Sequence, residues 1–229
     1  MKQSRPFNPS PAELAKIYRT RFSGRDSYRR SVWKQIIAQL LSPWIPSDGR
    51  ILDLGAGHGE FINQATTSGR LFAMDLNPDT GRFLGPRVTF LRQNCSSPWK
   101  IPPRSLDLVF TSNFFEHLPD KECLMKTLLQ AFRALRPGGR LVALGPNIRL
   151  LPGAYWDFWD HYLPLTERSL AEAGKLAGFR VEQAVAATLP YSMSQEFQPP
   201  VWAVRLYLSF PFLWHFLGKQ FLVVLRKSP

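Results

Sequence analysis

The chain has 229 residues, of which 45% are hydrophobic and 13% aromatic, and it contains only two cysteines. This composition predicts one globular domain and excludes a disordered chain, a disulfide scaffold and a fibrous repeat. The formal net charge is +12, and residues 1–50 carry ten basic but three acidic side chains, so the excess is mainly N-terminal. Such an excess suits nucleic acid, an anionic membrane surface or an acidic substrate.

The two ends of the chain bear on localisation. Residues 1–11 are polar and contain no apolar leader, so we expect a cytoplasmic protein. The most apolar stretch, 201–217, is interrupted by Arg205, Pro211 and His215. It falls short of the roughly 20 apolar residues that a spanning helix needs. We therefore expect this stretch to be buried or to lie at a membrane surface, and peripheral membrane contact stays open.

The predicted elements begin with residues 1–44, a basic helical arm or lid whose two helices, within 12–41, are separated at Ser23-Gly24. From Gly49, short β-type runs alternate with helical ones, which indicates a mostly parallel sheet flanked by helices. We expect strands at 51–54, 71–74, 88–91, 106–111, 141–144, 179–184 and 221–226. Helices are expected to begin near Gly59, at Asp120 and at Glu167.

The most informative run is RILDLGAGHGEF, residues 50–61: a strand, three glycines and a helical start. Glycines at such a turn let the backbone approach a ligand closely. The dinucleotide fingerprint G-x-G-x-x-G needs a glycine where this chain has Glu60. Asp53 repels a pyrophosphate and suits a cationic amine, while Asp75, at the end of the next strand, can accept hydrogen bonds from two ribose hydroxyls. The pair favours a nucleoside that carries a cation over a dinucleotide.

Five features then stand in order: DLGAGHG at 53–59, Asp75, SLDLVF and NFFEHLP within 105–119, and LRPGGR at 135–140. Together they resemble the class I S-adenosylmethionine (SAM)-dependent methyltransferases, particularly the small-molecule and sugar-modifying branch. The resemblance covers about residues 45–185. It implies an α/β, three-layer Rossmann-like sandwich with a seven-stranded, mostly parallel sheet and an antiparallel C-terminal strand. Residues 45–229 would form the methyltransferase domain, with 188–219 as an apolar insertion before the last strand.

The resemblance implies SAM as the cofactor. The residues expected to bind it are Asp53, Gly55, Ala56, Gly57, Gly59, Asp75, Leu76, Asn77, Asn94 and Asn113. The glycines would line the methionine portion, Asp75 would bind the ribose, and Leu76 and Asn77 would lie against the adenine. Asn94 stands where the family commonly has an acid that accepts from the adenine amino group, and its amide oxygen can accept the same bond more weakly.

Catalysis requires alignment of donor and acceptor, and a hydroxyl acceptor also requires a base. The candidates are His117, in the turn after the fourth strand, and Asp160 and His161, in a loop rich in aromatic residues. Aromatic side chains beside acids suit a sugar ring. The alternative interpretation is a packed histidine and a buried aromatic anchor. No metal site is expected, because the usual ligand spacings are absent.

We therefore expect O-methylation of a small-molecule or glycan acceptor, including a lipid-linked one. RNA-directed methylation remains an alternative because of the charge, although nucleic acid is not the favoured partner. The chain does not resemble the methylases that act on base nitrogens, whose motif is an Asn or Asp followed by two prolines and an aromatic residue. Here Asn113 is followed by Phe114. A SAM-binding module without catalysis also stays open. An NAD-dependent sugar-modifying enzyme also stays open, although this chain lacks the Tyr-x-x-x-Lys pair by which it would resemble such families.

The basic arm has three interpretations. It could be a solvated helix face, or a lid whose Tyr18 or Arg21 closes over the SAM carboxylate. The third interpretation is a surface for phosphate groups of a substrate or a membrane lipid.

Overall fold

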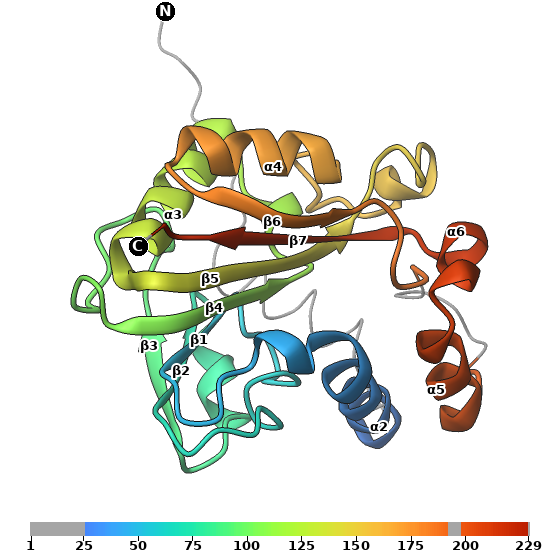
Figure 1. The fold of residues 1–229 in the computed structure, drawn as a ribbon, viewed down its shortest axis with the longest axis horizontal. Coiled ribbons are helices and arrows are strands. Elements are labelled where there is room, and N and C mark those ends of the chain that lie inside the picture. Colours follow the sequence, from blue (N-terminus) through green and yellow to red (C-terminus); the bar gives the residue numbers. More distant parts are fainter. Residues whose placement is uncertain (1–25, 192–197, 229) are drawn as a thin grey trace, which may run out of the picture.

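The computed structural model describes residues 26–191 and 198–228. Seven strands form one sheet in the order β3-β2-β1-β4-β5-β7-β6 (Figure 1). Their bounds are β1 (Ile51–Leu54), β2 (Leu71–Asp75), β3 (Val88–Arg92), β4 (Leu106–Ser112), β5 (Leu135–Pro146), β6 (Arg180–Val185) and β7 (Gln220–Arg226). β7 pairs antiparallel with β5 and β6, and the remaining pairs are parallel. The expected seven-stranded, mostly parallel sheet with an antiparallel C-terminal strand is confirmed.

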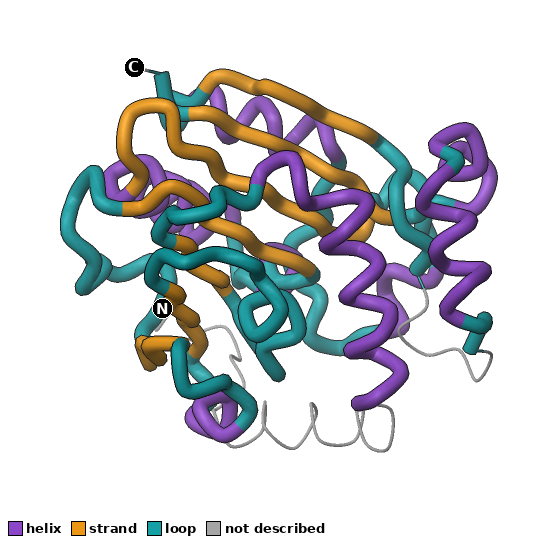
Figure 2. The backbone as a smooth tube through the Cα atoms, turned by 60° about the horizontal axis from the view of Figure 1, so that its bottom comes forward, coloured by secondary structure: helices purple, strands orange, loops and turns teal. Residues whose placement is uncertain are grey.

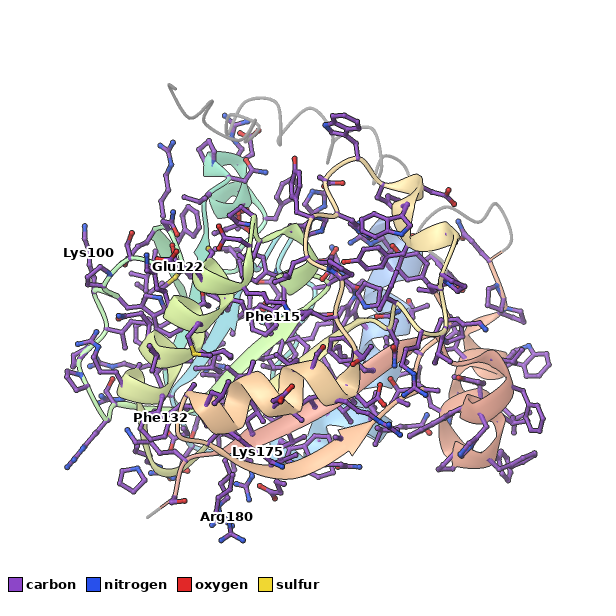
Figure 3. The ribbon with its side chains drawn as sticks, turned by 90° about the horizontal axis from the view of Figure 1, so that it is seen from above. Lys100, Phe115, Glu122, Phe132, Lys175 and Arg180 are labelled. Carbon is purple, nitrogen blue, oxygen red and sulfur yellow. The ribbon has the colours of Figure 1, made fainter. Side chains whose placement is uncertain are left out.

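Helices cover both faces of this sheet, which gives three layers. One face carries α3 (Lys121–Ala134) and α4 (Glu167–Leu176), and Figure 3 views it from above, with Phe132 near the end of α3. The other face carries α2 (Asp26–Ile36), the π-helical turn η1 (Ile37–Leu41) and α5 (Val201–Ser209), as Figure 2 shows. The shorter helices are η2 (Ser42–Trp44), η3 (Pro78–Arg82), η4 (Phe115–His117), η5 (Ala154–Asp157), η6 (Pro211–Leu213) and α6 (Trp214–Leu217).

Helix α3 begins where the sequence predicts. The side chain of Asp120 caps it by accepting from the backbone N–H of Cys123 at 2.7 Å. Leu124 and Leu128 are buried on the inner side of the helix. The helix ends at Ala134, and β5 starts directly at Leu135, six residues before the expected strand. Its first residues include the sequence Pro-Gly-Gly and pair irregularly with β4, so the strand pattern was hidden from the sequence.

The prediction of a helix that begins near Gly59 is wrong, because residues 60–64 form turns. The N–H of Asn63 donates to the Gly59 carbonyl and that of Ala65 to the Phe61 carbonyl, which makes a single helical turn. The sequence Thr-Thr-Ser-Gly follows at 66–69, and these residues have low helix propensity. The chain therefore reaches β2 before a second turn can form.

The predicted arm contributes to the core. Its second helix is α2, and Ile36, Ile37 and Leu40 are buried against the sheet with the residues of β1 and β4. A hydrogen bond from the Tyr28 hydroxyl to the Pro199 carbonyl, at 2.7 Å, ties α2 to the segment before α5. The first predicted helix, with Tyr18 and Arg21, lies outside the described residues. The domain boundary at residue 44 stays a prediction.

The predicted insertion, 188–219, contains α5, η6 and α6 within its described residues. These helices lie at the end of the sheet where the parallel strands finish, beside α2 (Figures 1 and 2). No helix among the described residues is long and apolar enough to cross a membrane.

Candidate functional site

A cavity of about 1200 Å³ opens where β1, β2 and β4 end, the edge at which open α/β sheets bind ligands. Most of the predicted site residues line it. They are Asp53, Gly55, Ala56, Gly57, Asp75, Leu76, Asn77, Asn94, Asn113, His117 and Asp160. Gly59 and His161 do not line it, so two of the predicted residues lie behind the wall.

The glycine loop owes its shape to backbone angles that other residues rarely adopt. Gly55, Gly57 and Gly59 have φ of 73°, 52° and 72°, all in the left-handed region. A Cβ on Gly55 would lie 2.3 Å from the ring of Phe114, whereas a Cβ on Gly57 would meet nothing within 4 Å. Gly55 is therefore required by packing, and Gly57 leaves open space beside the backbone.

The carboxylate of Asp75 is held in place from two sides. One oxygen accepts from the N–H of Gly57 at 2.9 Å and the other from the N–H of Asn77 at 2.8 Å. Burial raises the pKa of Asp75, and the backbone N–H groups partly oppose this. A carboxylate has about four acceptor positions, so the group can still accept bonds from ligand hydroxyls.

Asp53 lies deeper, with 4% of its surface exposed. Burial raises its pKa well above the usual range, and the negative charges of Glu60 and Asp75 raise it further. Three carboxyl groups thus share one end of the cavity, and only Glu60 has an ion pair, with Arg29, among the pairs found in the described part of the chain. This electrostatic environment favours a cationic ligand group and disfavours a pyrophosphate.

The residues expected beside the adenine are held by local hydrogen bonds. The side-chain oxygen of Asn77 caps η3 by accepting from the N–H of Asp79 at 3.0 Å. The side-chain oxygen of Asn94 accepts from both the N–H and the hydroxyl of Ser96, at 2.9 and 2.8 Å. The oxygen that was expected to face the adenine amino group is therefore already bonded within its own loop. Leu76 is 43% exposed at the cavity wall.

Asn113 has an unusual backbone for a residue other than glycine, with φ of 48°. Its amide nitrogen donates to the Ser112 hydroxyl at 3.1 Å. Its amide oxygen is buried and has no hydrogen-bond partner among the described residues. This residue lines the cavity, so it offers an acceptor to a ligand N–H group.

His117 and Asp160, which are 43 residues apart, form a pair. The Nδ1 atom of His117 lies 2.8 Å from the backbone carbonyl oxygen of Asp160 and 3.3 Å from its carboxylate. Both are acceptors, so in the neutral imidazole the proton is on Nδ1 and the Nε2 atom carries the lone pair. Asp160 is 1% exposed. A histidine oriented in this way at a cavity wall has the arrangement of a general base.

A second histidine lies behind this pair. The Nδ1 atom of His161 is 2.9 Å from the Tyr155 carbonyl, and its ring lies 5.0 Å from that of His117. Burial raises the pKa of Glu116 to about 7, although the neighbouring His117 lowers it. Glu116, His117 and His161 each have a ligand atom within 4.8 Å of the others, so this group could hold a metal ion. Its members come from two segments, which motif spacing could not indicate.

The aromatic loop is divided between three environments. Tyr155 is fully buried, and its hydroxyl donates to the Leu163 carbonyl at 2.6 Å. Phe158 lines the cavity. Trp156 and Trp159 are 56% and 76% exposed. The interpretation of the loop as a buried anchor therefore holds for Tyr155, and Phe158 is the member placed to contact a ligand.

The cavity also has lining residues that the sequence interpretation did not identify. They are Tyr28, Val32, Trp33 and Ile36 from α2, Tyr191 before the undescribed gap, and Val204, Tyr207 and Leu208 from α5. The apolar spacing in α2 indicated a buried face, but periodicity alone does not reveal what that face meets.

Comparison with known proteins gives consistent matches. A family model described as a methyltransferase domain matches residues 25–184. Methyltransferase str2 of Strobilurus tenacellus is 30% identical over 96 residues, 41% of this chain and 34% of that protein. The demethylmenaquinone methyltransferase of Symbiobacterium thermophilum is 26% identical over 156 residues, 59% of this chain and 58% of that protein. The chain thus matches less than two thirds of these relatives' length.

The fold has many solved counterparts. The crystal structure of a SAM-dependent methyltransferase from Archaeoglobus fulgidus is similar with a TM-score of 0.65 and 19% sequence identity. The similarity covers 89% of this chain and 97% of that one. At this level of identity the likeness supports the fold.

Proposed function

Since this chain belongs to the class I SAM-dependent methyltransferase family, we propose that it transfers a methyl group from SAM to an oxygen of a small-molecule or glycan acceptor. One observation carries the proposal. A single cavity joins a carboxylate-rich glycine loop, suited to a cationic nucleoside, to a histidine whose Nδ1 atom is held by Asp160. Neither half would be sufficient without the other.

The residues present fit SAM, which when bound supplies a methyl group on a positively charged sulfur. Gly57 leaves open space beside its backbone, where any side chain would intrude. Asp75 is positioned to accept from the ribose hydroxyls, and the orphaned amide oxygen of Asn113 to accept from an ammonium group. Asp53 lines the same end of the cavity, where a cationic ligand group would favour its ionised form.

In the proposed reaction, the Nε2 atom of His117 takes the proton of the acceptor hydroxyl. Asp160 positions the imidazole and stabilises the cation that forms. The new oxygen–carbon bond forms as the sulfur–carbon bond breaks, and the electron pair of the broken bond stays on sulfur. Phe158 and the apolar residues of α2 and α5 orient the acceptor and exclude water.

A carbon acceptor is the second candidate, supported by the relative that is named for demethylmenaquinone. Removing a proton from an activated carbon would use the same histidine. The apolar side chains on one wall, from α2 and α5, suit a hydrophobic ring or chain. NMR of the isolated product separates the candidates, because methyl groups on oxygen and on carbon resonate at different shifts.

We also propose that the chain contacts an anionic membrane surface peripherally, which would bring it to lipid-linked acceptors. RNA is the less favoured partner.

The cofactor assignment is tested by calorimetric titration of SAM into the full chain and into the Asp53→Ala and Asp75→Ala variants. We expect weaker binding in both, because each substitution removes a carboxylate from the same end of the cavity. Asp48→Ala, an exposed acid outside the cavity, is the matched control. Unchanged affinity in both test variants would overturn the assignment.

The base is tested by release of S-adenosylhomocysteine in the presence of sugar, phenol and polyprenyl-linked acceptors. We expect His117→Ala to lower the rate about 10²- to 10⁴-fold while SAM affinity is retained. His215→Ala, an exposed histidine outside the cavity, is the control. Loss of activity on chelation of divalent ions would instead assign the Glu116 group a metal-binding role.

A further inference from the structure

Large apolar side chains are exposed along the segment from α5 to α6. They are Trp202 at 69%, Leu206 at 51%, Phe210 at 46%, Phe212 at 62%, Phe216 at 72% and Leu217 at 56%. We call these six residues the outer face. Single exposed apolar residues are common on proteins, but a group of them on three consecutive short helices is typical of a binding surface. In Figure 3 the outer side chains of these helices project away from the body of the molecule.

Helix α5 is apolar on both of its sides. Trp202 and Leu206, four residues apart, lie on the outer face, while Val204, Tyr207 and Leu208 line the cavity. Packing at the cavity accounts for the inner side only, which leaves the outer apolar side available to a binding partner. Leu217 belongs to the outer face and also lines the cavity. The outer face and the cavity lining therefore meet at Leu217.

The formal charges within the segment of the outer face have one sign. Residues 198–220 include Arg205 and Lys219 but no aspartate or glutamate. The neighbouring helix α2 begins with Asp26, and its Arg29 pairs with Glu60, while Arg30 and Lys34 are exposed basic residues. Arg205 is exposed between Trp202 and Leu206. Aromatic side chains beside basic ones are the composition of a surface that binds anionic lipid headgroups.

We propose that the outer face docks on an anionic lipid bilayer and so turns the cavity mouth toward the membrane. An amphiphilic acceptor could then enter the cavity without crossing water. This deepens the proposed function, on which the entry of an acceptor rests, but the docking itself does not require catalysis. The η5 loop lies at the same end of the molecule (Figure 1), and its exposed Trp156 and Trp159 would lie close to the headgroups.

The experiment is flotation of the full chain with vesicles of phosphatidylcholine alone or mixed with phosphatidylglycerol, at low and high salt. We expect co-flotation with the mixed vesicles at low salt, and weaker binding at high salt. Phe212→Ser combined with Phe216→Ser should lower vesicle binding about tenfold or more, because each ring loses its burial in lipid. Leu129→Ser combined with Leu176→Ser, exposed leucines on α3 and α4, is the matched control and should bind like the unaltered chain.

A charge variant distinguishes binding to anionic lipid from an apolar contact of any other kind. Arg205→Gln should weaken binding to the mixed vesicles about fivefold and leave binding to pure phosphatidylcholine unchanged. Arg180→Gln, an exposed arginine on β6 that Figure 3 labels, is its control. Circular dichroism of every variant shows whether each one is folded, independently of SAM binding.

Three outcomes overturn the docking. The first is failure of the unaltered chain to float with the mixed vesicles at low salt. The second is flotation of the Phe212→Ser, Phe216→Ser variant to the same extent as the unaltered chain. The third is an unaltered chain that binds no vesicles but forms a dimer, seen by light scattering, which this variant loses. The last would assign the face to a second copy of the chain. Flotation without SAM binding would contradict the proposed function and leave the docking intact.

Discussion

The two walls of the cavity are built in different ways. Most of the proposed cofactor wall comes from one stretch of the chain, 53–77, with Asn94 and Asn113 added from later loops. Backbone angles and backbone N–H groups set the geometry of that stretch. The acceptor wall is assembled from side chains of η4, the η5 loop, α2 and α5. A wall made by local backbone geometry tolerates few substitutions, whereas a wall made by distant side chains can change its specificity one residue at a time.

Substitutions on the acceptor wall should have the largest effect, a loss in the rate of methyl transfer. His117→Ala on the acceptor wall should reduce the rate far more than Asp160→Asn. In the asparagine variant the backbone carbonyl at residue 160 still holds the Nδ1 proton, so only stabilisation of the charged imidazole is lost. We expect a loss of about 10- to 100-fold in kcat for Asp160→Asn.

The measurement is kcat as a function of pH together with SAM affinity by calorimetry. Asp157→Asn, which changes another acid at the cavity wall, is the control. If Asp160→Asn weakened SAM binding and left kcat unchanged, the division between the walls would be wrong.

On the cofactor wall the expected effect is on stability. Gly55→Ala combines a left-handed backbone with an overlap against Phe114, so we expect a loss of about 3 kcal/mol or more in the free energy of unfolding. Gly57→Ala meets no neighbour and should lose only about 1–2 kcal/mol from its backbone angle. Gly153→Ala has an ordinary φ and open space, and should change stability by less than about 0.5 kcal/mol.

Urea unfolding of the three variants gives these values. Equal losses in Gly55→Ala and Gly57→Ala would show that the contact with Phe114 does not restrict the loop.

The buried carboxyl behind the acceptor wall predicts a pH dependence. Because burial raises the pKa of Glu116 from 4.5 to about 7, the folded state binds its proton more tightly than the unfolded state does. The stabilisation is complete below about pH 4.5 and is lost as the pH rises through 7. Glu116→Gln should remove up to about 3 kcal/mol of this pH dependence and make the protein more stable than the unaltered chain at pH 8.

Unfolding free energies of Glu116→Gln and of the control Glu172→Gln, an exposed acid on α4, are to be measured from pH 5 to pH 8. A slope in the Glu116→Gln variant that matches the unaltered chain would mean that another group titrates.

Local patterns predicted the fold well. The seven strands and the cap at Asp120 depend on residues close in sequence, and the structure contains them, although β5 starts six residues before the expected strand. The predicted glycines and acids lie at the cavity, except Gly59, and their contacts with SAM stay a prediction. The predicted helix after Gly59 is absent because the segment before β2 is short and its threonines have low helix propensity, so a helix longer than one turn is not stable there.

The acceptor wall was only partly predictable. His117 and Asp160 could each be named as candidates, but their pairing depends on a contact across 43 residues. The contribution of α2 and α5 to the cavity depends on how both helices pack on the sheet, which no periodicity specifies. The outer face of the apolar segment after Val201 and its cavity-lining side likewise became distinguishable only once burial was known.

The smallest expected effect concerns the aromatic loop. Trp159→Ala removes a side chain that is 76% exposed, so we expect a change in the free energy of unfolding below about 0.5 kcal/mol and unchanged turnover of soluble acceptors. Phe158→Ala removes a cavity-lining ring that stacks on His161 at 4.9 Å, and should raise the KM for the acceptor about tenfold. Steady-state kinetics with a soluble acceptor measures both variants. If Trp159→Ala raised the acceptor KM as much as Phe158→Ala does, the acceptor wall would extend beyond the cavity onto the exposed loop, and the boundary drawn here would have to move outward.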